Sequence, residues 1–266
     1  MKGPADRSPT GVGADNVPNG DGSRAAAAED PAGTSSLAWE KLISPASLED
    51  LVKGGKLRLD RLVTTPAAFI GGGYVQARKE FSLQALLFAI VESYPQRVRW
   101  KNSAAVARER FARVAANTLA GSADAYQEAR NRLLDLNDLL SGAALESATA
   151  PPPIKWSQLI DRVPMMQLLE WAHEEQLAKM VANENQFAEN ADRLQRYAEL
   201  IAVLGKVALD EDMPDAADDD YAALAKEMIA HAQDIVRAVQ TNNPQLARAA
   251  SGQLGQCCTR CHDSFR

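Results

Sequence analysis

Long apolar runs are absent from this 266-residue sequence, and no stretch approaches the roughly 20 apolar residues that a membrane-spanning helix requires. Cysteine and histidine are scarce, with three of each, and aromatic residues make up 6% of the chain. Hydrophobic residues are plentiful at 46%, and charged residues make up 24%. This balance is typical of a globular protein and excludes disorder of the whole chain.

Residues 1–35 lack an apolar block and are rich in Gly, Ala, Pro, Asp and Ser. Such a segment cannot bury enough apolar surface to offset the entropy lost on folding, so we predict a disordered tail. The same residues lack the charged start and the apolar core of a secretory signal.

Sustained strand alternation is absent from Ser36 onward. Ala, Leu, Glu, Arg and Gln dominate instead, and apolar residues recur at spacings of three and four. The predicted fold class is therefore all-α.

The helical part of the chain contains an internal repeat. Trp39-Glu-Lys-Leu-Ile returns as Trp156-Ser-Gln-Leu-Ile, and two further similarities lie in nearly the same register. They pair residues 104–109 with 222–227 and residues 127–130 with 245–248. A shared register indicates tandem duplication, although helices rich in Ala and Arg also match by accident.

From the repeat we predict a first helical copy over residues 36–147, a semi-rigid proline-rich linker over 148–155 and a second copy over 156–266. Periodicity and the stop signal Asn243-Pro244 predict four helices in the second copy. Their expected spans are 157–183, 186–209, 218–241 and 244–263. Because four helices with short connections form an antiparallel bundle, the expected fold is two tandem antiparallel four-helix bundles.

All three cysteines and one histidine lie between positions 257 and 262. Cys258-x-x-Cys261-His262 has the spacing of a c-type haem attachment site, in which both thiols form thioethers and the imidazole binds iron. A redox disulfide is typical of a βαβ context that this sequence lacks. A zinc site needs four ligands, and here only the distant His173 and His231 could add to those of the motif. Haem attachment is the favoured interpretation.

In the register of the repeat, the two motif cysteines and the motif histidine lie opposite Leu140, Ala143 and Ala144. The first copy therefore offers neither thiols nor an imidazole where a haem would attach. We expect one covalent haem c, in the second copy, and a haem-free first copy.

A predicted bundle with Cys-x-x-Cys-His in its last helix and Asp-Ser-Phe-Arg at its end resembles the class II c-type cytochromes, the cytochrome c′ family. The resemblance covers residues 156–266, and residues 36–150 resemble the family only as a degenerate copy. It implies thioethers from Cys258 and Cys261 and His262 as the proximal iron ligand. The family is usually a single bundle, so the size of this chain departs from its pattern.

The resemblance implies further haem contacts. In the family an aromatic residue and an arginine follow the ligand histidine, here Phe265 and Arg266. An arginine in the first helix is followed four positions later by the residue on the open side of the iron, here Arg162 and Met166. Glu49 lies near the position of Met166 in the first copy, consistent with a site that lost its metal.

The role of Met166 is open at this point. A thioether ligand gives six-coordinate iron suited to electron transfer, whereas a non-ligating side chain leaves five-coordinate iron open to small gases. Both methionines could also simply fill the core, and Met165 is the lesser candidate ligand.

His173 lies further along the same helical face and could in principle bind the iron. A lone histidine on an apolar helix face is more often a hydrogen-bonded core residue than a ligand. Cys257 is expected to be buried, and an exposed thiol that forms an intermolecular disulfide is the alternative.

Charge is shared unevenly between the copies. Residues 156–266 carry 10 Lys/Arg and 18 Asp/Glu, whereas residues 36–155 carry 16 and 12. The acidic run at 210–220 is either a solvated loop or a surface that steers a basic redox partner. A docking of the basic copy on the acidic copy is a third interpretation.

The function expected is that of a monohaem cytochrome, not an enzyme, that carries single electrons between redox partner proteins. A gas-binding haem protein and a haem-bearing module that docks a partner enzyme are the alternatives. Thioether attachment normally takes place outside the cytoplasm, so we expect a periplasmic or other extracytoplasmic location, with a signal that was removed or precedes the numbered start. No nucleic acid and no membrane span are expected, and a homodimer is left open.

Overall fold

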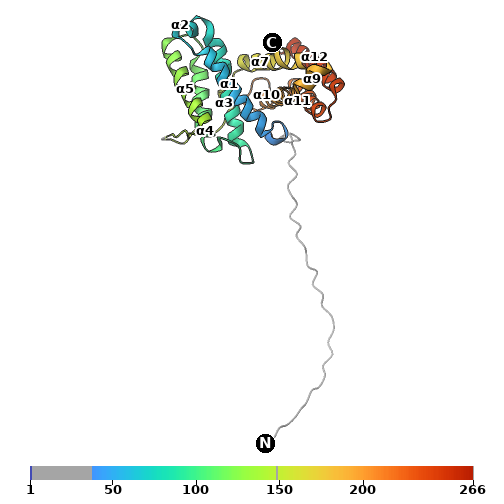
Figure 1. The fold of residues 1–266 in the computed structure, drawn as a ribbon, viewed down its shortest axis with the longest axis horizontal. Coiled ribbons are helices and arrows are strands. Elements are labelled where there is room, and N and C mark those ends of the chain that lie inside the picture. The colour runs from blue at the N-terminus through green and yellow to red at the C-terminus, as the bar shows by residue number, and fades with distance from the viewer. Residues whose placement is uncertain (2–37, 148, 266) are drawn as a thin grey trace. The chain divides into compact units, whose positions relative to one another are not determined.

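The computed structural model describes Met1, residues 38–147 and residues 149–265. The tail predicted over residues 1–35, apart from Met1, lies outside these described residues, and so does Arg266. From residue 38 onward the described chain belongs to one compact unit (Figure 1). None of its helices combines the length and the apolar character needed to cross a membrane.

Helices are the regular elements of the described residues, which contain no strand, so the all-α prediction is confirmed. The main helices of the first half are α1 (Pro45–Leu62), α3 (Tyr74–Ser93), α4 (Ala104–Asn117) and α5 (Ala123–Ser141). Those of the second half are α7 (Arg162–Glu170), α10 (Ala191–Ala208), α11 (Asp219–Gln240) and α12 (Pro244–Ser264). The shorter elements are α2 (Pro66–Ala68), α6 (Trp156–Leu159), α8 (Ala178–Met180), α9 (Glu184–Glu189), 3-10 turns at Trp39–Lys41 and Lys101–Ser103, and π-helical turns at Phe69–Gly73 and Trp171–Leu177.

Helix starts follow from local side-chain chemistry. An N-cap oxygen accepts a hydrogen bond from a backbone N–H of the first turn, which would otherwise lack a partner inside the helix. Caps of this kind are Ser44, Thr65, Ser122, Asn183, Asp218 and Asn243. Proline stands at the start of α1, α2 and α12, where its missing N–H costs nothing.

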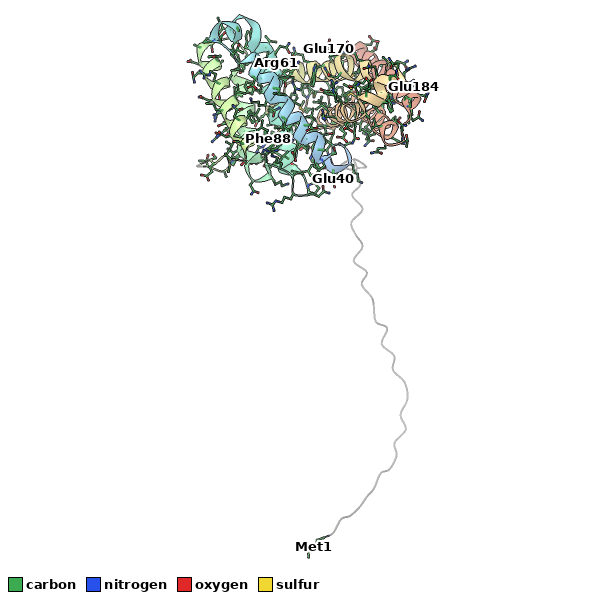
Figure 2. The ribbon with its side chains drawn as sticks, viewed as in Figure 1. Met1, Glu40, Arg61, Phe88, Glu170 and Glu184 are labelled. Carbon is green, nitrogen blue, oxygen red and sulfur yellow. The ribbon has the colours of Figure 1, made fainter. Side chains whose placement is uncertain are left out.

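Helix α3 is the centre of the first half, because it packs on both α1 and α4. Its residues from Glu80 to Val91 are buried on every face. The rings of Phe81 and Phe88 lie 6.2 and 5.6 Å, centroid to centroid, from the ring of Phe111 in α4. Figure 2 shows Phe88 among the helices of this half and Glu170 among those of the other.

In the second half α11 packs on both α10 and α12. The helix predicted over 157–183 is interrupted, because Ile160 and Asp161 have extended backbone between α6 and α7. Pro164 in the first turn of α7 explains the break, because its ring would clash with the Ile160 carbonyl in an unbroken helix. Ile160 itself is buried, and the N–H and hydroxyl of Ser157 in α6 donate to Asp212. The helix predicted over 186–209 is likewise divided at Asn190, between α9 and α10.

The two halves contact each other through reciprocal pairs of helices. Helix α3 packs on α7, and α1 packs on α10. The repeated tryptophans Trp39 and Trp156 meet with ring centroids 5.2 Å apart. Arg78 of α3 pairs with Asp161, and Arg196 of α10 pairs with Asp50 of α1. The short helix α6 of the second half also packs on α3 and α4, so the contact between the halves extends beyond these two pairs.

The proline-rich segment between the halves is fixed by Arg108, a buried side chain of α4 that is 2% exposed. Its Nε donates to Oε2 of Glu92 in α3 at 2.6 Å, and its Nη2 donates to the carbonyl of Pro152 at 2.6 Å. One guanidinium thus connects α3, α4 and the segment that leads into the second half.

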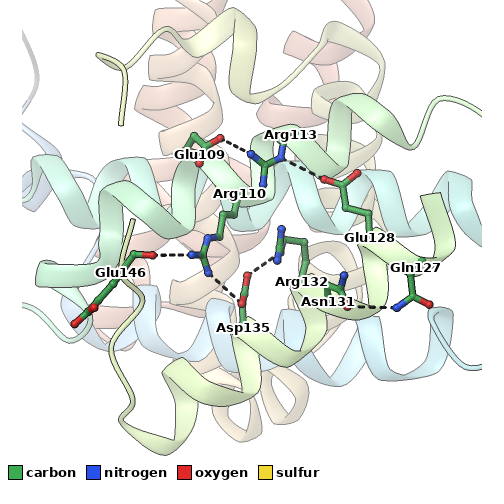
Figure 3. Close-up of polar contacts among 9 residues, drawn as sticks. All are labelled: Glu109, Arg110, Arg113, Gln127, Glu128, Asn131, Arg132, Asp135 and Glu146. Carbon is green, nitrogen blue, oxygen red and sulfur yellow. Dashed lines mark hydrogen bonds and ion pairs between the residues drawn. The ribbon is translucent and has the colours of Figure 1, made fainter. Parts of the chain in front are cut away.

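Ion pairs connect α4 to α5, one of them through the exposed Arg113 and another through the half-buried Arg110 (Figure 3). Arg113 pairs with Glu109 in its own helix and with Glu128 in α5. Arg110 pairs with Asp135 of α5 at 3.2 Å and donates to the carbonyl of Glu146 at 2.7 Å. Pairs of this kind at the surface are each worth at most about 1 kcal/mol.

Replacing Arg108 tests the role of the buried guanidinium. Arg108→Ala should lower the free energy of unfolding by about 2–4 kcal/mol, because it leaves Glu92 and the Pro152 carbonyl without their donor. Arg113→Ala in the same helix removes the same group from the surface and should cost less than about 1 kcal/mol. Denaturant unfolding of both variants measures the difference, and equal losses would contradict the prediction.

Candidate functional site

A cavity of about 680 Å³ lies in the second half, between α7, the π-helical turn after it, α11 and α12. Both motif cysteines and the motif histidine line it. The other residues used below that line it are Arg162, Met166, Leu169, Glu174, His173, Tyr221, Leu224, Met228, Gly255, Cys257 and Phe265. Its volume is in the range of cofactor and small-molecule sites, about 300–1,000 Å³.

Helix α12 carries the motif to the cavity. Small and apolar residues at helical spacing, from Ala247 to Leu254 and Cys257, form its buried stripe. Its position is fixed further by Arg248, whose Nε and Nη2 donate to the carbonyls of Val181 and Ala182 at 3.1 and 2.8 Å. The Cys257 thiol donates to the Leu224 carbonyl of α11 at 3.2 Å. Cys257 is 2% exposed, so it is buried as expected.

The two motif thiols lie next to this stripe and face the cavity. Cys258 and Cys261 are each half-buried, and they are one helical turn apart. His262 follows in the last turn of α12, where its imidazole is exposed and borders the cavity. The structure therefore places the three sequence-predicted attachment residues around one hollow.

The opposite wall comes from the first helix of the second half. Met166, Leu169 and His173 line the cavity on one face of that helix, which passes from α7 into the π-helical turn. Met165 is 1% exposed and does not line the cavity. Nε2 of His173 donates to the Ser251 carbonyl of α12 at 3.1 Å, so it bridges the two walls.

The absence of a side chain at Gly255 leaves space for the His173 ring beside α12. A Cβ atom at Gly255 would lie 3.3 Å from Cε1 of His173, closer than most such contacts. The third histidine, His231, does not line the cavity, and its Nε2 lies 3.4 Å from Oε1 of Glu227.

The mouth of the cavity holds a charged pair and an aromatic pair. Arg162, at the start of α7, pairs with Asp215 of the acidic segment. The rings of Phe265 and Tyr221 meet edge to face with centroids 5.3 Å apart. Arg162 and Phe265 both line the cavity, while the other predicted arginine, Arg266, is outside the described residues.

Burial disfavours ionisation of all three thiols. It raises the pKa of Cys257 to about 11, with a smaller contribution from the charge of Glu227. Burial also raises the pKa of Cys258, assisted by Cys261 and Glu174, and raises the pKa of Cys261 against the opposing charge of Arg162. Unmodified Cys258 and Cys261 are therefore protonated thiols at neutral pH.

These residues fit a covalently attached haem. Two thiols one turn apart face a hollow whose lining is largely apolar, with Met166 and Leu169 on the opposite wall, and an imidazole borders the same hollow. Within the described residues, no three His, Cys, Asp or Glu side chains form a group that could hold a metal ion by themselves. A haem iron does not need such a group, since the porphyrin supplies most of its ligands and the protein one or two.

Several lining residues were not found from the sequence. Tyr221, Gly255 and Glu174 border the cavity because α7, α11 and α12 converge there, and no sequence motif contains them. The position of Tyr221 was the available signal: it is an aromatic residue in the first turn of α11, directly after the acidic segment.

Comparison of the chain with protein-family models, with curated proteins and with solved structures gives no match in any of the three.

Thiol reactivity tests the burial of Cys257. At pH 8 a thiol with a pKa of about 11 has roughly one molecule in a thousand as the reactive thiolate. Alkylation of Cys257 in the folded, haem-free chain should therefore be very slow at pH 8 and accelerate about tenfold per pH unit up to pH 10. Peptide mass spectrometry measures the rate, and the chain in denaturant is the control. Equal rates in the folded and denatured chains at pH 8 would contradict the prediction.

Proposed function

We propose that this protein is a monohaem c-type cytochrome that carries single electrons, with its haem in a second four-helix bundle of the cytochrome c′ kind. The observation that carries the proposal is the convergence of Cys258, Cys261 and His262 on one cavity, opposite a largely apolar wall. The first half is a related bundle without haem. The protein is not an enzyme in this proposal.

Haem c, when bound, supplies an iron that alternates between the ferric and ferrous states. Cys258 and Cys261 would hold the porphyrin through thioethers, and His262 would supply the proximal nitrogen ligand to its iron. Leu169, Leu224 and Met228 keep water from the pocket. Arg162 is placed at the mouth to balance negative charge of the haem's carboxylates, because a guanidinium keeps its charge when partly buried.

Met166 is the distal ligand in this proposal. It lines the cavity on the wall that faces α12, whereas its neighbour Met165 packs into the core. A histidine and a thioether together raise the reduction potential and suit electron transfer. His173 is given a structural role in this proposal, because its Nε2 bonds the Ser251 carbonyl and so joins α12 to the opposite wall of the cavity.

The acidic segment beside the cavity suits a basic redox partner. Asp215 at the mouth belongs to the run at 210–220, and the second half carries a formal charge of −8. Attraction between opposite charges raises association rates at low salt. Attachment of haem c normally takes place outside the cytoplasm, so we place the protein in an extracytoplasmic compartment.

Counting free thiols tests covalent attachment. The holoprotein unfolded in denaturant should take up one alkyl group, at Cys257, whereas the haem-free chain should take up three. Replacing Cys258 and Cys261 together by Ser should leave one free thiol and no haem on the unfolded chain. Intact-mass spectrometry measures the number of alkyl groups and the mass of bound haem in all three samples. Three alkylated cysteines in protein purified with its haem would contradict the proposal.

The pair Met165 and Met166 tests the distal ligand. Met166→Leu should convert low-spin six-coordinate iron to high-spin iron that binds carbon monoxide readily, since leucine has no ligating atom. Met165→Leu is the matched control and should leave the spectrum unchanged, because its side chain does not reach the cavity. Absorption spectra of both variants decide the matter.

The alternative function, binding of small gases, has its own outcome in the same experiment. Leu169 lines the cavity near Met166 and has no ligating atom. If Met166 does not bind the iron, the sixth coordination position is therefore free for a small gas. High-spin iron that binds carbon monoxide in the wild-type protein would contradict electron transfer through a His/Met centre and favour gas binding.

A further inference from the structure

A second cavity, of about 490 Å³, lies in the haem-free half. Its walls are the loop from Arg97 to Ser103, between α3 and α4, and the residues after α5, Gly142 to Ala144. In the register of the repeat, Ala143 and Ala144 occupy the positions of Cys261 and His262. In the structure, however, Cys261 and His262 lie inside α12, whereas Ala143 and Ala144 lie just beyond the end of α5. The second cavity is therefore described on its own residues.

Every charged residue that lines this second cavity is positive. These residues are Arg97, Arg99 and Lys101. Arg97 is exposed, Arg99 donates from Nη2 to the Leu140 carbonyl at 2.8 Å, and Lys101 donates to the Tyr94 carbonyl. The carboxylate that approaches them is Glu49, whose Oε2 lies 3.6 Å from Nη1 of Arg99. Three cations thus share a concave site that no carboxylate lines.

Trp100 anchors the loop that carries the cations and contacts one of them, Arg99. It has φ of 64°, a left-handed conformation that is a genuine outlier for a bulky side chain. Its Nε1 donates to the Leu139 carbonyl at 2.8 Å, and its ring meets Phe88 edge to face with centroids 6.1 Å apart. The Arg99 guanidinium lies 4.7 Å from the centre of the same ring. Backbone strain of this kind persists where the surroundings enforce it, and it gathers at binding sites.

The start of α4 adds to the positive potential. Asn102 and Ser103, which directly precede α4, line the cavity. No side chain caps the first turn of this helix among the described residues, because the Ser103 hydroxyl accepts from the N–H of Leu145 instead. The start of a 14-residue helix, which carries partial positive charge, is therefore adjacent to two residues that line the cavity.

We propose that this cavity binds a small polyanion, a phosphate or a short dicarboxylate, through Arg97, Arg99 and Lys101. The proposal does not depend on haem, because no residue of this cavity lines the other one. The ligand neutralises three like charges that the fold holds together and takes hydrogen bonds from the two guanidinium groups, which suit oxyanions.

Calorimetric titration of the full chain at low ionic strength tests this proposal, with inorganic phosphate and succinate as two separate probes. We expect saturable binding of at least one probe with one site per chain, and weaker binding as salt is added. The indole N–H signal of Trp100 in a ¹⁵N spectrum should shift during the titration. Saturable binding of phosphate alone, or of succinate alone, identifies the chemical class.

The variant with Arg97→Gln and Lys101→Gln should bind at least about tenfold more weakly, since it loses two charge-assisted contacts. The matched control, Arg237→Gln with Lys179→Gln, removes the same two charges from exposed positions of the second half and should bind as the wild type does. Circular dichroism verifies that both variants fold. Absence of saturable binding to the wild type, or equal losses in both variants, would overturn the proposal.

Discussion

The candidate haem site depends on the position of α12. Its buried stripe, the bonds from Arg248 to the end of the first helix of that half, and the Cys257 thiol on the Leu224 carbonyl hold this helix against its neighbours. With that stripe buried, the helical period leaves Cys258, Cys261 and His262 on the side that faces the cavity. Burial of Cys257 thus orients the two thiols that follow it.

The two halves have different chemistry around their cavities. In the second half, two thiols, an imidazole and a largely apolar lining surround the larger cavity. In the first half, Trp100, three cations and the alanines after α5 line the smaller one. The reciprocal packing of α3 on α7 and of α1 on α10 is what a duplicated bundle that pairs with itself would produce.

The sequence predicted the parts of the molecule that local pattern determines. Helical period and caps were enough for the all-α class, and Asn243-Pro244 marks the start of α12. The break at Ile160 has a local signal that the prediction of one continuous helix neglected: Pro164 has no N–H, and its ring would clash with the Ile160 carbonyl in an unbroken helix. The attachment residues stand in a readable motif, whereas Tyr221 and Gly255 join the site only through the packing of separate helices. The cations around Trp100 were overlooked because no motif describes them.

The visible spectrum and the intact mass of the wild-type chain, made in a host that attaches haem c, test the central claim most directly. The account predicts a coloured protein whose mass in denaturant exceeds that of the polypeptide by one haem. It also predicts an absorption spectrum that changes on reduction as a low-spin haem does. A colourless product with the mass of the bare polypeptide would contradict it.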